Sequence, residues 1–134
     1  IYAAYLPRMT ASGIPHTWIR EKGLTNFADS VETENADGDI YNNLQEYIAD
    51  THPTNEASYF KPLAIRNTDT GALELEVADS STGRQYTIYG RTNLTNGTWT
   101  AKTNSAGNGS NKVYDMTQDL DTGKWFYRGS VKRE

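Results

Sequence analysis

The chain has 134 residues, carries a formal net charge of −4 at pH 7 and contains no cysteine. This length allows one or two small domains with a modest hydrophobic core. The acidic charge argues against nucleic-acid binding, which needs a basic surface, and the lack of cysteine excludes disulfides and thiolate metal sites. Because no run of about 18 apolar residues occurs, no membrane partner is expected.

The chain starts at Ile1 without an initiator methionine, and no signal-peptide pattern follows. We therefore expect a segment of a longer protein, with a preceding domain of the parent chain as its neighbour. The activity of the parent protein would then lie outside this segment.

Short helical patterns alternate with polar loops over residues 1–60. The sequence IPHTWIREKGL places Ile14, Trp18 and Ile19 on one side of a helix, and Gly23 follows its end. Further on, NLQEYIAD predicts a second short helix that the sequence THPTN interrupts. Together these features predict a helix–loop region over residues 1–60.

From Pro62 onward the hydrophobic residues recur with a period of two. Leu73, Leu75 and Val77 alternate with glutamates, and RQYTIYGRT, GTWTAK, NKVYDMT and KWFYRGSVK continue the series. Turn sequences such as DSSTG and DLDTG separate these segments. The fold class is therefore predicted to be mainly β, with an antiparallel β-sandwich over residues 61–134.

The stretch NADGDIYNNLQEY crowds oxygen-bearing side chains in front of the second predicted helix. A twelve-residue calcium loop takes its ligands from positions 1, 3, 5, 7, 9 and 12. Counting from the first asparagine places an oxygen donor at each position: Asn35, Asp37, Asp39, the Tyr41 carbonyl, Asn43 and Glu46. We predict one bound Ca²⁺ here, and a solvated acidic loop is the alternative.

Two positions depart from the usual calcium loop. Position 1 is Asn35 rather than Asp, and position 6, normally a glycine with positive φ, is Ile40. Moving the frame to place Gly38 at position 6 puts Leu44 at position 12, which cannot ligate. The loop must therefore turn differently around Ile40, and we expect weak affinity, in the range of about 10⁻⁴ to 10⁻³ M or somewhat tighter.

DGDIYNNLQEYIADTHPTN resembles the thrombospondin type 3-like, EF-hand-like calcium repeats of secreted bacterial proteins, and GIPHTWIREKGL resembles their companion motif. The resemblance covers residues 12 to about 60. It implies a calcium cofactor, a secreted location, and a module that often belongs to a polysaccharide-degrading parent. QYTIYGRTNLTNGTWTA and KWFYRGSV are similar, more loosely, to the fibronectin type III-like modules that follow such repeats.

The companion loop departs from the family pattern where acids are expected. Those positions are occupied by Arg8, Thr10, Ser12, His16 and Ile19. An arginine at the first ligand position and an isoleucine at the last cannot hold Ca²⁺, so this first site is interpreted as lost.

The two histidines, His16 and His52, stand where the family has aspartate. Their predicted role is surface replacement, and a transition-metal site built on the pair is the alternative. Such a site would need further ligands.

Nothing in the chain favours catalysis, because G-x-S-x-G and H-E-x-x-H are absent and no cysteine nucleophile exists. The aromatic residues of the β half instead suggest a sugar-binding face. Its candidates are Trp125, Tyr127 and Tyr89, whereas Trp99 is assigned to the core. Two roles remain open for the sandwich: a module that binds a polysaccharide, or a structural spacer, sorting or protein-interaction module.

Overall fold

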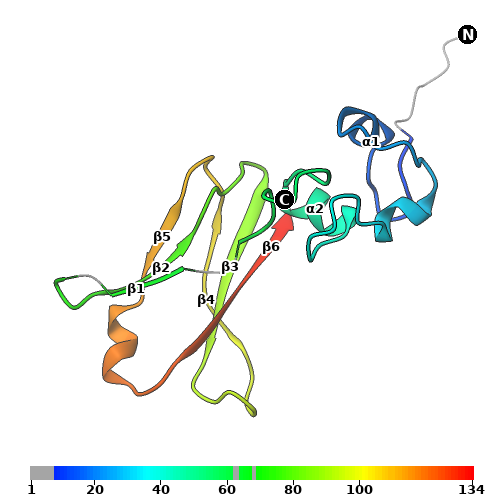
Figure 1. Cartoon of the computed structure of the whole chain (residues 1–134). Helices are drawn as coiled ribbons and strands as arrows, with labels where there is room; N and C mark the ends of the chain where they lie inside the picture. The colour runs from blue at the N-terminus through cyan, green and yellow to red at the C-terminus, as the bar shows by residue number, and fades with distance from the viewer. Residues whose placement is uncertain (1–7, 62–63, 68) are drawn as a thin grey trace, which may run out of the picture. The chain divides into compact units, whose positions relative to one another are not determined.

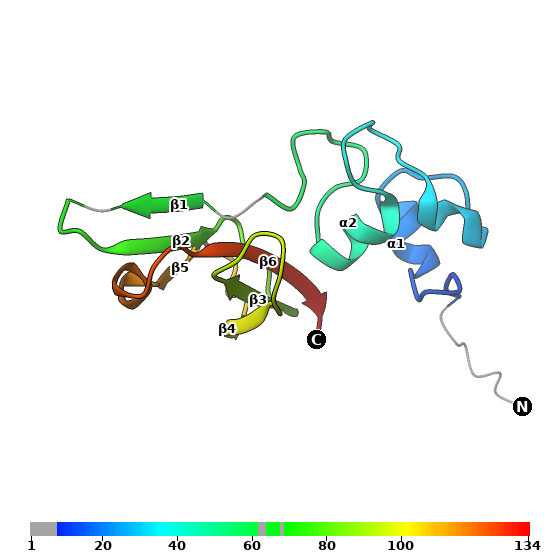
Figure 2. The same cartoon turned by 90° about the horizontal axis from the view of Figure 1, so that it is seen from below.

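The computed structural model describes residues 8–61, 64–67 and 69–134. The chain divides into two compact units, Ile1–Phe60 and Lys61–Glu134. It is mainly β, as the fold class predicted, with short helices in the first unit and strands in the second (Figures 1 and 2). In the part of the chain that the structure describes, no helix combines the length and the apolar character needed to cross a membrane.

The first unit contains α1 (His16–Glu21), the 3₁₀ helix η1 (Asp29–Thr33) and α2 (Asn43–Ala49). Its core is formed by Ile14, Ile19, Val31 and Tyr47, all buried. Trp18 packs edge-to-face on Tyr47 with 5.3 Å between ring centroids. The predicted apolar side of the first helix is therefore the side that builds the core.

Local capping signals bound α2 at both ends. The Asn42 side chain accepts from the Gln45 amide, and the Gln45 side chain accepts from the Asn42 amide, which forms a capping box. At the other end Asp50 adopts the left-handed conformation with φ 62°. The capping box fixes the start of the helix directly after the acidic loop, and Asp50 ends it.

The second unit is a sandwich of two antiparallel sheets, described over residues 61, 64–67 and 69–134. Its strands are β1 (Ala64–Asn67), β2 (Leu73–Val77), β3 (Arg84–Arg91), β4 (Thr100–Ala106), β5 (Lys112–Asp115) and β6 (Phe126–Arg133), with the 3₁₀ helix η2 (Thr117–Asp121) before β6. One sheet has the order β1-β2-β5 and the other β4-β3-β6 (Figure 1). Sequence-distant strands thus become neighbours in both sheets.

Both sheets contribute to one hydrophobic core. The core contains Leu73 and Leu75 from β2, Ile88 from β3, and Met116, with Tyr127 of β6 packed against it. Burial alternates along β2 as the period of two predicted, because successive side chains of a strand point to opposite faces.

Trp99 does not belong to this core, so its core assignment was wrong. The residue lies just before β4 and is only partly buried. Two guanidinium groups lie over its indole ring, that of Arg91 at 4.3 Å and that of Arg128 at 4.9 Å from the ring centroid. These contacts are favourable cation–π pairs that a core position would not offer.

Candidate metal centre

Three carboxylates of the acidic loop and of α2 converge on one point. Oxygens of Asp37, Asp39 and Glu46 all lie within 4.8 Å of one another. Glu46 is only 1% exposed, and the two aspartates are partly buried. Like charges this close repel one another, and burial strengthens the repulsion because the local dielectric is lower than that of water.

Each of these carboxylates uses one oxygen in the fold and leaves the other free. Asp37 Oδ1 accepts the Asp39 amide at 3.2 Å, and Asp39 Oδ1 accepts the Tyr41 amide at 2.6 Å. Glu46 Oε1 accepts the Thr51 hydroxyl at 3.2 Å. The second oxygens, Asp37 Oδ2, Asp39 Oδ2 and Glu46 Oε2, are buried and have no partner among the described residues.

Asn43 contributes a fourth free oxygen. The residue is fully buried, and its Nδ2 donates to the Val31 carbonyl at 2.9 Å. This bond fixes the orientation of the amide and leaves Oδ1 buried without a partner. An unpaired buried oxygen costs about 1 to 3 kcal/mol, and the loop and the first turn of α2 together hold four of them, which could serve as ligands of a cation.

The electrostatics of Glu46 reflect the same crowding. Burial, followed by the negative charges of Asp37 and Asp39, raises the pKa of Glu46 to about 7 from an ordinary value of 4.5. A divalent cation at this point would act in the opposite direction, because a nearby positive charge favours the ionised carboxylate.

The remaining two predicted ligands are placed differently. The Asn35 side chain closes the loop, because its Oδ1 accepts the Gly38 amide at 2.8 Å and its Nδ2 donates to the Asp39 carbonyl. The Tyr41 side chain points to the end of the unit, where its hydroxyl donates to the Phe60 carbonyl at 3.1 Å. Only the backbone carbonyl of Tyr41 was predicted to ligate.

The departure at Ile40 has a simple structural solution. The left-handed conformation falls on Gly38, with φ 81°, and Ile40 has no positive φ. Its side chain is 79% exposed and points away from the protein interior. The loop therefore turns two residues earlier than the usual calcium loop, and a β-branched residue at Ile40 is not strained.

In the loop before α1, backbone amides donate hydrogen bonds to carboxylates of η1. Asp29 Oδ1 accepts the Ala11 amide at 2.8 Å, and Glu32 accepts the Ser12 amide at 2.6 Å and the Ser12 hydroxyl at 2.9 Å. Hydrogen bonds from Thr10 and Ser12 lower the pKa of Glu32. Ile19, at the position of the last ligand, is fully buried in the core.

The histidines take separate structural roles. The His52 Nδ1 lies 3.4 Å from the Thr54 amide and 3.1 Å from the Thr54 hydroxyl, the position where an aspartate oxygen would accept in such a turn. His16 packs on Phe27 with 5.3 Å between ring centroids. Over the described residues, the one group of three or more potential metal ligands among His, Cys, Asp and Glu is the acidic one, and neither histidine belongs to it.

The aromatic residues predicted to bind sugar lie on two faces of one sheet. Trp125 and Tyr127 stack with 6.3 Å between centroids and planes 15° apart. Tyr127 is paired with Gly90 across the sheet, and Tyr89 with Arg128, so alternation places Tyr89 on the opposite face. The three residues therefore do not form a single platform.

A polar cluster that the sequence did not reveal lies beside Tyr127. The Tyr127 hydroxyl donates to Asp119 Oδ2 at 2.6 Å, and Lys102 Nζ donates to Asp119 Oδ1 at 2.7 Å. Burial and the Asp119 carboxylate raise the pKa of Tyr127. The cluster joins β4, η2 and β6, and no local pattern in the sequence signals such a contact.

Comparison of the chain with protein-family models, curated proteins and solved structures gave no match.

Proposed function

We propose that the chain is a non-catalytic accessory module of a secreted protein, stabilised by one structural Ca²⁺ in the acidic loop. The observation that carries this proposal is the set of four buried, unpartnered oxygens on Asp37, Asp39, Asn43 and Glu46. Four of the six buried side-chain atoms without a partner in the described residues belong to this set. The Tyr41 carbonyl and Asn35 are the expected sources of the remaining ligands.

The donor set favours a hard cation. All of the proposed ligands are carboxylate, amide or carbonyl oxygens, which suit Ca²⁺ and Mg²⁺ rather than metals that prefer nitrogen or sulfur. Ca²⁺ accepts irregular geometry with six to eight ligands, whereas Mg²⁺ needs a near-ideal octahedron and keeps several waters. A loop that turns at Gly38 rather than at the usual sixth position is irregular, and it is therefore better matched to Ca²⁺.

The ion would act as a staple within the first unit. It would cancel the repulsion among three carboxylates and join the loop to α2 through Glu46 and Asn43. Asn43 is in turn bonded to the Val31 carbonyl in η1, so the restraint extends to a second element. Binding to the folded state alone stabilises it by about 2.7 kcal/mol at a hundredfold excess over Kd.

The staple also reaches the end of the first unit. Tyr41 follows the aspartates directly, donates to the Phe60 carbonyl and stacks on Tyr59 with 6.4 Å between centroids. Phe60 is the last residue of this unit. Ordering the loop would therefore also hold Tyr59 and Phe60 in place.

The proposal includes a secreted location and a fibronectin-like second unit. The weak affinity expected of this loop matches extracellular rather than cytosolic calcium. The sandwich places its first, second and fifth strands in one sheet and its third, fourth and sixth in the other, and this partition is compatible with an immunoglobulin-like or fibronectin-like module.

Calorimetric titration with CaCl₂ and with MgCl₂ tests the proposal. We expect one Ca²⁺ per chain and weaker binding of Mg²⁺. The variants Asp39→Asn and Glu46→Gln should weaken calcium binding strongly, whereas the matched changes Asp29→Asn and Glu32→Gln in the first unit should leave stoichiometry and affinity unchanged. Absence of calcium binding at millimolar concentrations would overturn the proposal.

A further inference from the structure

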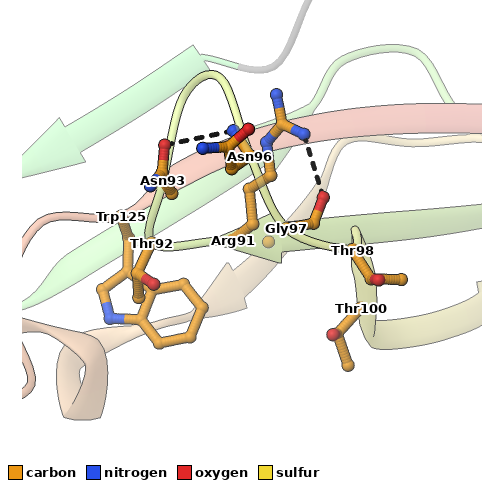
Figure 3. Close-up of a pocket in the computed structure, with 9 residues that line it drawn as sticks. Arg91, Thr92, Asn93, Asn96, Gly97, Thr98, Thr100 and Trp125 are labelled. Atoms are coloured by element: carbon orange, nitrogen blue, oxygen red, sulfur yellow. Dashed lines mark hydrogen bonds between the residues drawn. The ribbon is translucent and has the colours of Figure 1, made fainter.

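A pocket of about 250 Å³ opens beside the loop that joins β3 and β4 (Figure 3). Its walls come from the end of β3, the loop, the start of β4, and Trp125 in front of β6. We infer that this pocket binds one neutral sugar residue of a polysaccharide, with Trp125 as its apolar wall. The inference concerns the second unit and does not depend on the calcium site.

Trp125 is held firmly where it borders the pocket. Its Nε1 donates to the Thr122 hydroxyl at 2.8 Å, and Lys102 Nζ lies 4.0 Å from the ring centroid. Gly90 makes room for it, because a Cβ at that position would lie 3.3 Å from Cε3 of the indole. A prepositioned aromatic ring loses little entropy when a ligand packs against it.

Neutral hydrogen-bonding groups surround this ring. The side chains of Thr92, Asn96, Thr98 and Thr100 line the pocket and are exposed. Among the residues that the structure describes, none of these four side chains forms a hydrogen bond, so their hydroxyl and amide groups are available to a ligand. Hydroxyls and amides beside a partly exposed indole match a sugar, which offers C–H groups on one face and hydroxyls around its edge.

The loop itself is braced before any ligand arrives. The Arg91 guanidinium donates to the Gly97 carbonyl at 3.2 Å and to the Leu94 carbonyl, and it stacks on Trp99. Asn93 Oδ1 accepts the backbone amide of Asn96 at 3.2 Å (Figure 3). Polar groups carried on a braced loop lose less freedom on binding than those on a mobile one.

Charge and size define the class of ligand. The lining holds no carboxylate, and its one cation, Arg91, already donates to two loop carbonyls. Lys102, next to the indole, is paired with Asp119 at 2.7 Å. The Arg91 Nε has no hydrogen-bond partner within the described ranges but is buried, so a ligand in the pocket cannot reach it. The volume lies below the roughly 300 Å³ typical of sites for larger ligands. The match is therefore to a single neutral sugar ring.

Titration of ¹⁵N-labelled full chain with cellohexaose, xylohexaose and mannohexaose, each to millimolar concentration, tests the inference. We expect at least one probe to shift the Trp125 indole resonance and the amides of residues 90–100, in calcium and in EDTA alike. Trp125→Ala should weaken binding about tenfold or more, and Trp18→Phe should not change it.

A second pair of variants distinguishes loss of sugar binding from loss of folding. Asn96→Ala and Thr100→Val alter the polar wall on an exposed surface, so the melting temperature should be retained while affinity falls. Absence of shifts with all three probes overturns the inference, and so does binding that the Trp125 and Asn96 variants leave intact. Because calcium binding is measured separately, a negative sugar titration leaves the calcium proposal standing.

Discussion

Replacing Glu46 by glutamine should stabilise the protein without calcium and remove most of the stabilisation that calcium provides. Glu46→Gln keeps the size of the side chain and an oxygen that can accept the Thr51 hydroxyl, but it removes the charge beside Asp37 and Asp39. Without calcium, the negative charge of Glu46 destabilises the folded state. With calcium, the Glu46 carboxylate is expected to bind the ion.

The expected magnitude follows from the pKa of Glu46. Because the folded-state pKa is raised from 4.5 to about 7, the folded protein binds more protons than the unfolded chain between these values. Stability in EDTA therefore falls as pH rises through this window, by up to about 3 kcal/mol. At pH 8 the glutamine variant should be more stable than wild type by up to this amount, and at pH 5 the gain should shrink below about 1 kcal/mol.

Calcium should remove most of the advantage of the variant. Wild type should gain about 2.7 kcal/mol at a hundredfold excess of Ca²⁺ over Kd, whereas the variant should gain little. Since the ion binds the ionised carboxylate, calcium affinity should rise with pH up to about 7 and then level off.

Urea unfolding with fluorescence detection measures these differences. Trp18 packs in the core of the first unit, so a background carrying Trp99→Phe and Trp125→Phe reports that unit alone. The reasoning is refuted if Glu46→Gln fails to stabilise the protein in EDTA at pH 8, or if the variant gains as much from calcium as wild type does.

Two further changes probe the sandwich. Asp119→Ala leaves Lys102 and Tyr127 without their hydrogen-bond partner in a largely buried site and should lower the free energy of unfolding in urea by about 3 kcal/mol. The exposed control Asp121→Ala should stay within about 0.5 kcal/mol of wild type. Equal effects of the two variants would contradict the cluster. Gly107→Ala places a Cβ 1.9 Å from the Ser81 carbonyl oxygen and should lower the melting temperature through a loss of at least about 2 kcal/mol, whereas the neighbouring Ala106→Gly should cost about 1 kcal/mol or less. A fully stable Gly107→Ala variant would rule out the close approach.

The two loops of the first unit meet the same backbone requirement differently. In the loop before α1, Asp29 and Glu32 accept the amides of residues 11 and 12 from outside the loop. In the loop before α2, the loop's own aspartates accept the amides and still have oxygens left over. Carboxylates consumed by hydrogen bonds cannot serve a cation well, which explains why only the second loop is proposed to bind one.

The features that the sequence determined are those that depend on near neighbours in the chain. Pro15 and Gly23 bracket α1, the capping box of Asn42 starts α2, and alternation along β2 marks its buried face. The convergence of Asp37, Asp39 and Glu46 belongs to the same class, because one loop and one helix turn bring these residues together. Their spacing alone was enough to predict the cluster.

Tertiary structure decided what depends on contacts between distant segments. The free oxygen of Asn43 exists because its amide nitrogen is bonded to Val31 in another element. The pocket beside the loop between β3 and β4 needs Trp125 to lie against a loop some thirty residues earlier in the chain. Trp99 lies outside the core, with the guanidinium groups of Arg91 and Arg128 over its ring. Strand period assigns a side chain to one of two faces, but which distant groups share that face is set by strand pairing and sheet packing, and these arise only when the whole sandwich folds.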